Sequence, residues 1–206
     1  MTFPEQKFTS VAEYAAAYFG QSRAAQESVD GKKLEAAFKI LDAAYGRGAQ
    51  LYVCGNGGSA SISNHLVCDH SKSGQTDTDI KPKVISLSTN IEIITAIAND
   101  ISYGDIFVYQ LQTLAKEGDV LMTISSSGDS ENVVRAAEWA KDQGLDVIAL
   151  TGFDGGRTAK LATVNLHVAG DNYGIIEDTH QGLMHILAQF IRQHHMDDAT
   201  IPDRKF

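Results

Sequence analysis

Short apolar runs alternate with longer segments of helical periodicity along most of this 206-residue chain. When a helix separates two strands, it carries the chain back to the end of the sheet where the first strand began. The two strands then run parallel, and the connecting helices cover both faces of the sheet. The pattern predicts an α/β fold with strands over residues 50–54, 83–87, 119–124, 146–150 and 163–168, and helices over residues 58–72, 91–115, 130–143 and 174–195.

Residues 8–48 precede this alternation and predict two further helices, separated at residues 29–32. Their apolar surface exceeds what one solvent-facing layer needs, so they pack on their own sheet or on another subunit. The aromatic residues concerned are Tyr14, Tyr18, Phe19, Phe38 and Tyr45. We therefore divide the chain into a helical extension with an oligomer interface (1–48), an α/β domain (49–196) and a polar, weakly ordered tail (197–206).

The composition disfavours several classes of protein. The net charge of −9 argues against nucleic-acid binding, which needs a basic surface. There is no run of 18 apolar residues, and the first residues lack the basic and apolar regions of a signal peptide. We expect a cytoplasmic protein without nucleic-acid or membrane partners. Cys54 and Cys68 form no Cys-x-x-Cys pair, so both are expected to be reduced thiols that pack inside the protein.

Two Ser/Gly-rich segments directly follow apolar runs. The first is Gly55-Asn-Gly-Gly-Ser59, and the second is Ser125-Ser-Ser-Gly-Asp-Ser130. Each predicts a turn between the end of a buried strand and the start of a helix. A helix N-terminus offers unpaired N–H groups and a partial positive charge to an anion, and serine hydroxyls add further donors. The two turns together predict a site for a small molecule that carries a phosphate group.

Other phosphate motifs fit less well. Residues 55–60 match the dinucleotide fingerprint G-x-G-x-x-A, but that motif needs an acidic residue at the end of the next strand. Here that strand runs into Thr89 and Asn90, with no acid before Glu92. The Gly-Lys-Ser/Thr of a P-loop is absent from the chain. A phosphate monoester, bound by N–H and O–H groups alone, suits these turns best.

The turns and several further segments resemble the SIS (sugar isomerase) domain family, and within it the phosphoheptose isomerase group. The resemblance covers nearly the whole chain and includes Cys54–Ser59, Ala98–Asp100, Gly118–Leu121, Ser125–Ser130, Leu150–Gly156 and the last helix with His180 and His185. It implies a three-layer, flavodoxin-like fold with a five-stranded parallel sheet. It also implies a homotetramer with active sites at subunit boundaries.

The same resemblance assigns substrate contacts. Four serines would hold the phosphate: Ser59, Ser125, Ser127 and Ser130. Asn56 and Asp100 would lie near the sugar. Neighbouring positions complete the expected binding set: Gly57, Gly58, Asn99, Ser126 and Glu177.

Acid–base candidates lie on two predicted helices. His65 and Asp69 are four residues apart and so share a helix face behind the first turn. The final helix carries Glu177, Asp178, His180, Gln181 and His185, and His185 lies among apolar neighbours, unlike an ordinary solvated residue. Outside this set, a structural role is our default for His167, a surface position is expected for His194 and His195, and His70 stays undecided.

By resemblance, His65 and His185 match histidines of the family that line the active site and are associated with zinc. Asp69 occupies the position of the family's catalytic glutamate, one methylene shorter, and Glu177 that of a glutamine. The set His65, Asp69, Glu177 and His185 is therefore a candidate site for zinc or another divalent metal. We assign Asp69 as the proton-transfer base and His185 as its acid partner, although one residue cannot freely be both ligand and base.

The leading hypothesis is an aldose–ketose isomerase that converts sedoheptulose 7-phosphate to D-glycero-manno-heptose 7-phosphate through an enediol, for nucleotide-activated heptose synthesis. Three alternatives stay open: an isomerase of another sugar phosphate, a non-catalytic SIS tetramer that binds a replication initiator protein, and a sugar-phosphate-sensing regulatory domain. The presence of His65, Asp69 and His185 argues against the second. The absence of a basic helix-turn-helix segment argues against the third.

Overall fold

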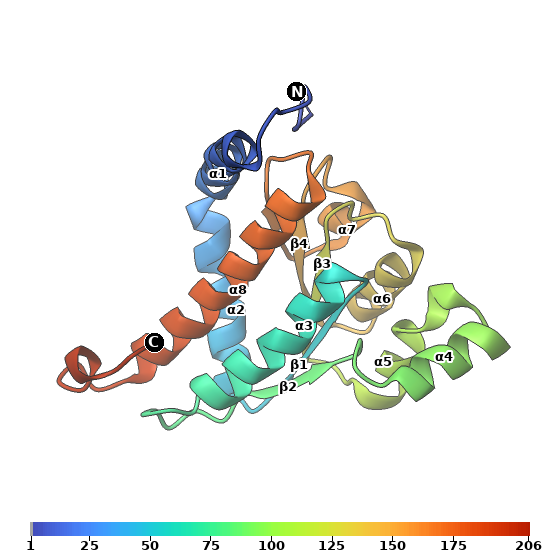
Figure 1. The fold of residues 1–206 in the computed structure, drawn as a ribbon. Coiled ribbons are helices and arrows are strands. Elements are labelled where there is room, and N and C mark those ends of the chain that lie inside the picture. Colours follow the sequence, from blue (N-terminus) through green and yellow to red (C-terminus); the bar gives the residue numbers. More distant parts are fainter. Residues whose placement is uncertain (1) are drawn as a thin grey trace.

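A five-stranded parallel sheet forms the centre of the computed structural model, which describes residues 2–206 (Figure 1). The strands are β1 (Gln50–Gly55), β2 (Lys83–Ser86), β3 (Val120–Ser125), β4 (Asp146–Thr151) and β5 (Val164–His167), in the order β2-β1-β3-β4-β5. This is the flavodoxin-like order, and each predicted strand agrees with the observed one to within a residue or two. The predicted α/β fold is confirmed.

Helices cover both faces of the sheet. One face packs against α2 (Gly31–Gly46), α3 (Gly58–Cys68) and α8 (Tyr173–His195), and α1 (Val11–Glu27) lies across α8. The other face packs against α4 (Ile91–Asp100), α5 (Val108–Leu114), α6 (Glu131–Asp142) and α7 (Gly156–Leu161). Alternate residues of the central strands enter the two cores, as in Val53 and Met122 on one face and Cys54 and Leu121 on the other.

The N-terminal helices differ in their role. Phe38, Leu41 and Tyr45 of α2 belong to the same apolar core as the sheet, so α2 packs on its own domain. On α1, by contrast, Phe19 leaves 70% of its surface exposed. The division of the chain at residue 48 stays a prediction, and the core is continuous across it.

Two predicted helices have a different form in the structure. The segment 91–115 is broken into α4, a 3-10 turn (Tyr103–Asp105) and α5, because Ser102 adopts an extended backbone and its hydroxyl bonds Asp105 at 2.8 Å. The segment 58–72 continues from α3 into a π-helical turn, Asp69–Ser73. Such turns occur frequently at functional sites, and this one begins at the expected base.

Two smaller expectations need correction. Cys54 is buried as predicted, but Cys68 is exposed because it lies on the outer side of α3. The polar tail is tied down rather than loose. Arg192 of α8 donates to the Lys205 carbonyl at 3.0 Å, and Asp77 accepts from both Arg192 and Arg204 at 3.0 Å. The tail includes a short 3-10 turn, Ile201–Asp203. Within residues 2–206, none of the helices combines the length and apolar character that crossing a bilayer requires.

Two histidines are buried where the helices meet the core. His70 lies beside the Tyr45 hydroxyl, with 2.6 Å from that oxygen to its Nδ1, and His180 has its Nε2 at 3.2 Å from the Thr151 carbonyl. Burial lowers the pKa of each imidazole to about 4. Both rings are therefore neutral at physiological pH and contribute packing rather than charge.

These two histidines predict acid sensitivity of the fold. The unfolded chain binds protons at both positions below about pH 6.5, whereas the folded chain does so only near pH 4, so acid favours unfolding across that interval. The free energy of unfolding falls as the pH falls through this interval. Each histidine should add at most about 1.4 kcal/mol per pH unit to the slope of that fall. Urea unfolding between pH 7 and 4.5 measures this slope. His180→Gln should lower this slope by up to about 1.4 kcal/mol per pH unit, the contribution of one proton. Gln193→Ala, which removes an exposed, non-titrating side chain from the same helix, should leave the slope unchanged.

Candidate functional site

The two Ser/Gly-rich turns meet where the neighbouring strands β1 and β3 end. The chain leaves these strands toward opposite faces of the sheet, and ligands of open α/β sheets bind at this point of divergence. A cavity of about 150 Å³ opens there. Its lining comes from both turns and from the start of α8: Asn56, Ser59, Ser125, Ser126, Ser127, Ser130, Tyr173 and Glu177.

The first turn brings the start of α3 close to α8. Gly57 caps α3 with a backbone φ of +54°, which favours glycine. A Cβ on Gly58 would collide with the carboxylate of Glu177 in its present position, so glycine lets that side chain lie against the start of α3. Gly57 and Gly58, both expected to bind the ligand, thus allow the N-terminus of α3 and the start of α8 to line the same cavity.

An amide pair joins the two turns. Asn56 and Asn132 exchange hydrogen bonds, with 2.9 Å between each amide nitrogen and the oxygen of its partner. The Tyr103 hydroxyl also donates to the Asn56 oxygen at 3.1 Å. Asn132 lies in the first turn of α6 and is buried. Asn56 therefore fixes the spacing of the two turns, and its amide faces the cavity already oriented.

The second turn offers hydroxyl groups to the cavity. Ser125 and Ser127 accept hydrogen bonds from the backbone N–H groups of Gly128 and Asp129, at 3.1 and 3.3 Å, and so shape the turn. The buried hydroxyl of Ser126 has no hydrogen-bond partner among residues 2–206. Such a group is costly unless a ligand or water satisfies it. A phosphate oxygen in the cavity would satisfy this donor.

Arg157 holds the second turn from outside. Its guanidinium donates to the Asp129 carboxylate at 3.0 Å, to the Asp129 carbonyl at 2.8 Å and to Glu131 at 3.0 Å. The hydrogen bond from Arg157 lowers the pKa of Asp129. Gly128 packs so closely on Gly155 that a side chain would not fit between them. The segment Leu150–Gly156 therefore supports the second turn rather than lining the cavity.

The cavity of about 150 Å³ between the two turns is called the serine cavity below. Among the described residues that line it, Glu177 is the one with an acidic side chain. Burial, reinforced by the neighbouring carboxylate of Asp178, raises its pKa. A bound phosphate would favour the protonated form further, because like charges disfavour ionisation. Glu177 is therefore suited to donate a hydrogen bond to an anion.

Three other predicted residues form a separate cluster further along the same two helices. Nε2 of His65 and Nε2 of His185 each lie 3.4 Å from a different oxygen of Asp69. The amide nitrogen of Gln181 lies 3.2 Å from His65 Nδ1 and 3.0 Å from His185 Nε2. One donor atom from each of His65, Asp69 and His185 lies within 4.8 Å of the others. The Asp69 carboxylate thus bridges two imidazoles next to a cavity that Asp69 and His185 line.

The structure does not bring all predicted site residues to these two places. Glu177 was expected among the metal ligands, but it lies two helical turns before His185 and lines the serine cavity. Asn99 and Asp100 bond one another at the end of α4, and Asp100 lines a different, largely apolar cavity of about 390 Å³. The reason is topological, because α4 extends away from the carboxyl ends of β1 and β3 (Figure 1).

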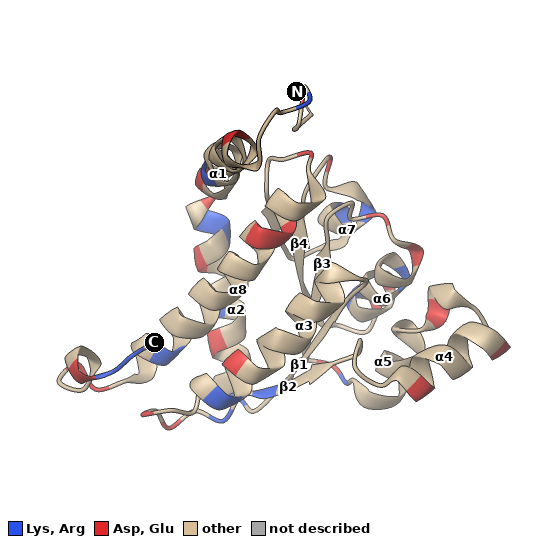
Figure 2. Cartoon of the chain, in the orientation of Figure 1, with Lys and Arg blue, Asp and Glu red and all other residues tan. Residues whose placement is uncertain are grey.

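The surroundings of the serine cavity carry no general excess of positively charged side chains. Figure 2 shows no Lys, Arg, Asp or Glu along α3, and the cationic side chain nearest to the second turn, Arg157, is already paired with acids. A phosphate at this place would therefore be held by helix N-termini, hydroxyls and amides. That matches the prediction of a site that needs no lysine.

Known proteins share this sequence and fold. The sequence profile of the SIS domain matches residues 17–152. A phosphoheptose isomerase of Helicobacter pylori (strain ATCC 700392 / 26695) is 34% identical over 180 residues, 86% of this chain and 93% of that protein. Another, from strain P12, is 40% identical over 70% of this chain and 75% of its own length. The chain belongs to the phosphoheptose isomerase group of the SIS domain family.

Solved structures agree with this membership. The phosphoheptose isomerase of Neisseria gonorrhoeae superposes with a TM-score of 0.82 at 30% identity, covering 89% of this chain and all of that one. That of Francisella tularensis gives a TM-score of 0.83 at 30% identity, covering 90% and 100%. The SIS fold therefore extends over nearly the whole chain.

Sequence reasoning missed several residues of this SIS domain site. Gln181 was noted as part of the final helix but given no role, although it contacts both histidines of the cluster. Asn132 and Tyr103 carry no local motif, since only the fold brings them to Asn56. Arg157 directly follows Gly155-Gly156. A cation beside a glycine pair is the local sequence signal that indicates a contact with a neighbouring turn.

Removal of the Arg157 side chain should weaken phosphate binding. In Arg157→Ala the second turn loses its outer support, Asp129 loses its hydrogen-bonded cation near the anion, and Glu131 keeps only its pair with Arg135. Because these ion pairs are partly exposed, we expect a loss of about three- to tenfold in affinity for inorganic phosphate. Isothermal titration calorimetry measures it. Lys160→Ala, one turn later on α7, removes the same charge without these contacts; an equal loss there would contradict a positioning role for Arg157.

Proposed function

We propose that this protein is an aldose–ketose isomerase that interconverts sedoheptulose 7-phosphate and D-glycero-manno-heptose 7-phosphate, whose product would feed synthesis of nucleotide-activated heptose. The observation that carries this proposal is the arrangement of two complementary sites along α3 and α8. A hydroxyl-rich anion cavity lies at the start of both helices, and a carboxylate flanked by two imidazoles lies further along them.

The separation of the two sites suits a long sugar phosphate. At 1.5 Å per residue, His65 lies about 9 Å along α3 from Ser59, and His185 lies about 12 Å along α8 from Glu177. With carbon–carbon bonds of about 1.5 Å, an extended seven-carbon chain places its phosphate about 10 Å from the first carbon. A phosphate among the serines therefore leaves C1 and C2 of a heptose near Asp69. A triose phosphate is too short to reach both places.

Asp69 and His185 have the geometry for proton transfer. In the direction from ketose to aldose, Asp69 removes a proton from C1 while the carbonyl oxygen at C2 gains one, which gives the enediol. The proton then returns to C2, and the hydroxyl at C1 loses its proton as the new carbonyl forms. His185, 3.4 Å from Asp69, exchanges protons with the two oxygens. The Gln181 amide, between the two histidine rings, holds them in place.

The donor set of the cluster also fits a divalent metal. Two imidazoles and a carboxylate within 4.8 Å suit zinc, and His65, Asp69 and His185 would hold it. Glu177 would be a ligand only if its side chain turned away from the serine cavity. A bound divalent ion supplies a Lewis acid that stabilises negative charge on the enediol oxygens. We propose on this basis that the cluster can bind zinc, and that Asp69 and His185 act as base and acid through atoms that the metal does not occupy.

The assembly is proposed to be a homotetramer with sites completed across subunits. Several large apolar residues of α4, α5 and the turn between them are exposed: Ile91, Ile93, Ile101, Tyr103, Tyr109 and Leu114. Exposed Val11 and Phe19 on α1 form a second apolar region. Contiguous exposed apolar surface marks interaction sites. Asp100, which lines the apolar cavity beside α4, would approach the sugar of a neighbouring subunit. A cytoplasmic location and the absence of nucleic-acid partners stay predictions.

Isomerisation is tested by NMR of the protein with sedoheptulose 7-phosphate in D₂O. We expect new aldose signals and deuterium at C1 and C2. Asp69→Asn should lower the rate at least about 100-fold, because a carboxamide cannot accept the proton. Asp79→Asn, which changes an exposed acid near the same segment, serves as the matched control. Phosphosugar binding without turnover in the unmodified protein would overturn the proposal in favour of an adaptor or of another sugar phosphate.

The tetramer is tested by light scattering coupled to size exclusion. Four chains of 22.2 kDa predict a mass of about 89 kDa. Ile101→Asp places a charge on the exposed apolar surface directly after α4 and should lower the mass. A mass of one chain for the unmodified protein at micromolar concentration would contradict the proposed assembly.

A further inference from the structure

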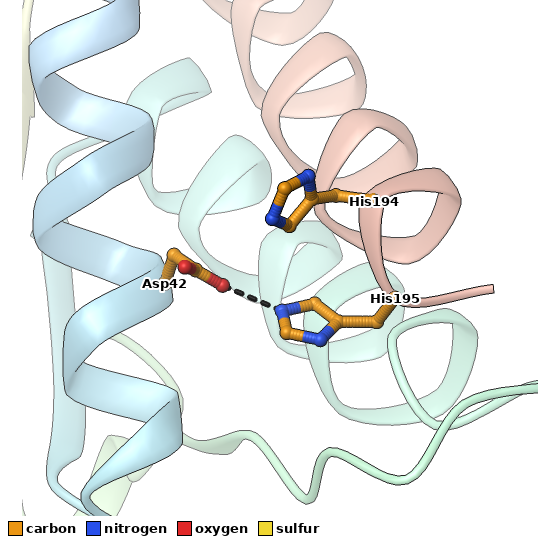
Figure 3. A group of neighbouring side chains, drawn as sticks. All are labelled: Asp42, His194 and His195. Atoms are coloured by element: carbon orange, nitrogen blue, oxygen red, sulfur yellow. Dashed lines mark hydrogen bonds and ion pairs between the residues drawn. The ribbon is translucent and has the colours of Figure 1, made fainter.

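A second group of metal-ligating side chains lies at the far end of α8, away from the site described above. Asp42 projects from α2, and His194 and His195 are the last two residues of α8 (Figure 3). One donor atom of each lies within 4.8 Å of the others. His194 is nine residues beyond His185, about 14 Å along the helix, so no single ion could serve both groups.

The three side chains are held in place by their neighbours. His195 Nε2 lies 2.5 Å from a carboxylate oxygen of Asp42. The His194 ring lies edge-on to Phe38, with 5.2 Å between ring centroids, and stacks on Phe190 at 6.3 Å. Its nitrogens make no hydrogen bond to any residue among 2–206. The aromatic contacts thus place the exposed His194 imidazole beside a carboxylate that already contacts the neighbouring imidazole.

The electrostatics of this place favour a cation. The Asp42 carboxylate is negative, and the last carbonyls of α8 carry the partial negative charge of a helix C-terminus. Two adjacent imidazoles would repel each other if both were protonated. A single divalent ion, bound by both rings in their neutral form, gives the positive charge without that repulsion.

We propose that Asp42, His194 and His195 form a second metal site, for zinc or a similar first-row divalent ion, that fastens the end of α8 to α2. Two imidazole nitrogens and one carboxylate oxygen suit zinc, cobalt or nickel and are poor ligands for magnesium or calcium. Zinc at 2.0–2.2 Å from each donor requires donors about 3.3 Å apart. Binding therefore requires the Asp42–His195 pair, now 2.5 Å apart, to open by somewhat less than 1 Å and the exposed His194 ring to turn toward it. Partial exposure leaves the fourth position to water.

The role of such an ion would be structural. Both α2 and α8 contribute to the core on one face of the sheet, and Phe38 packs edge-on against Phe190 at 4.9 Å just inside the proposed site. An ion that binds only when Asp42 and the end of α8 are together stabilises the folded chain by mass action. This inference does not depend on the proposed isomerase activity.

The test uses the full untagged chain, freed of metal, with the first cluster removed by His65→Gln and His185→Gln. This double variant should bind one equivalent of Zn²⁺ by isothermal titration calorimetry, and its thermal midpoint should rise with added Zn²⁺. Addition of Asp42→Asn or His194→Gln should weaken binding at least about 100-fold, because loss of a direct ligand exceeds the cost of losing a supporting contact. Glu35→Gln, on the same helix, is the matched control.

A second measurement keeps the proposal testable if the double variant is unstable. In the otherwise unmodified chain, His194→Gln should lower the number of bound Co²⁺ ions, counted by visible absorption, by one. Unchanged Zn²⁺ affinity in both Asp42→Asn and His194→Gln would overturn the site. Binding weaker than millimolar in the double variant would also overturn it, because it would reduce the group to an ion pair between His195 and Asp42.

Discussion

The parallel pairing of β1 with β3 positions the two serine turns that we assign to the phosphate of the ligand. Gly55 pairs with Ile124 at the last step of the register, so the two turns that follow begin side by side. The chain then departs toward α3 on one face and α6 on the other, which leaves a space between the turns. The Asn56–Asn132 pair fixes the width of that space. A shift in this pairing would separate hydroxyls that act together.

Helix geometry extends the site from this starting point. α3 and α8 both begin at the serine cavity, and their side chains meet again at His65, Asp69 and His185. The rise of 1.5 Å per residue therefore converts sequence spacing into a distance between phosphate and acid–base groups. The π-helical turn that follows α3 begins at the residue that we assign as base. The length of the substrate that we propose therefore depends on the spacing of these residues along α3 and α8.

The serine cavity and the acid–base cluster differ in the charged groups that they contain. The serine cavity has hydroxyl and amide groups and the carboxyl group of Glu177 inside and a paired cation, Arg157, outside, so the turn keeps its shape without a general positive field. The acid–base cluster combines a carboxylate with imidazoles, which can hold either protons or a metal ion. A similar combination recurs at Asp42, His194 and His195. The two clusters differ in their surroundings, since the first borders the proposed substrate site and the second lies between two packed helices.

Local sequence patterns were enough to predict the sheet, the serine turns and the His65–Asp69 pair, because these depend on short-range periodicity and on the residues that end strands and begin helices. Which distant residues meet is known only from the folded structure. It placed Gln181 between the two histidines, Asn132 against Asn56, and Glu177 in the serine cavity rather than in the metal cluster. It also placed His194 and His195, expected to be plain surface residues, opposite Asp42. Such contacts join residues up to about 150 positions apart, and no local pattern encodes a partner at that separation.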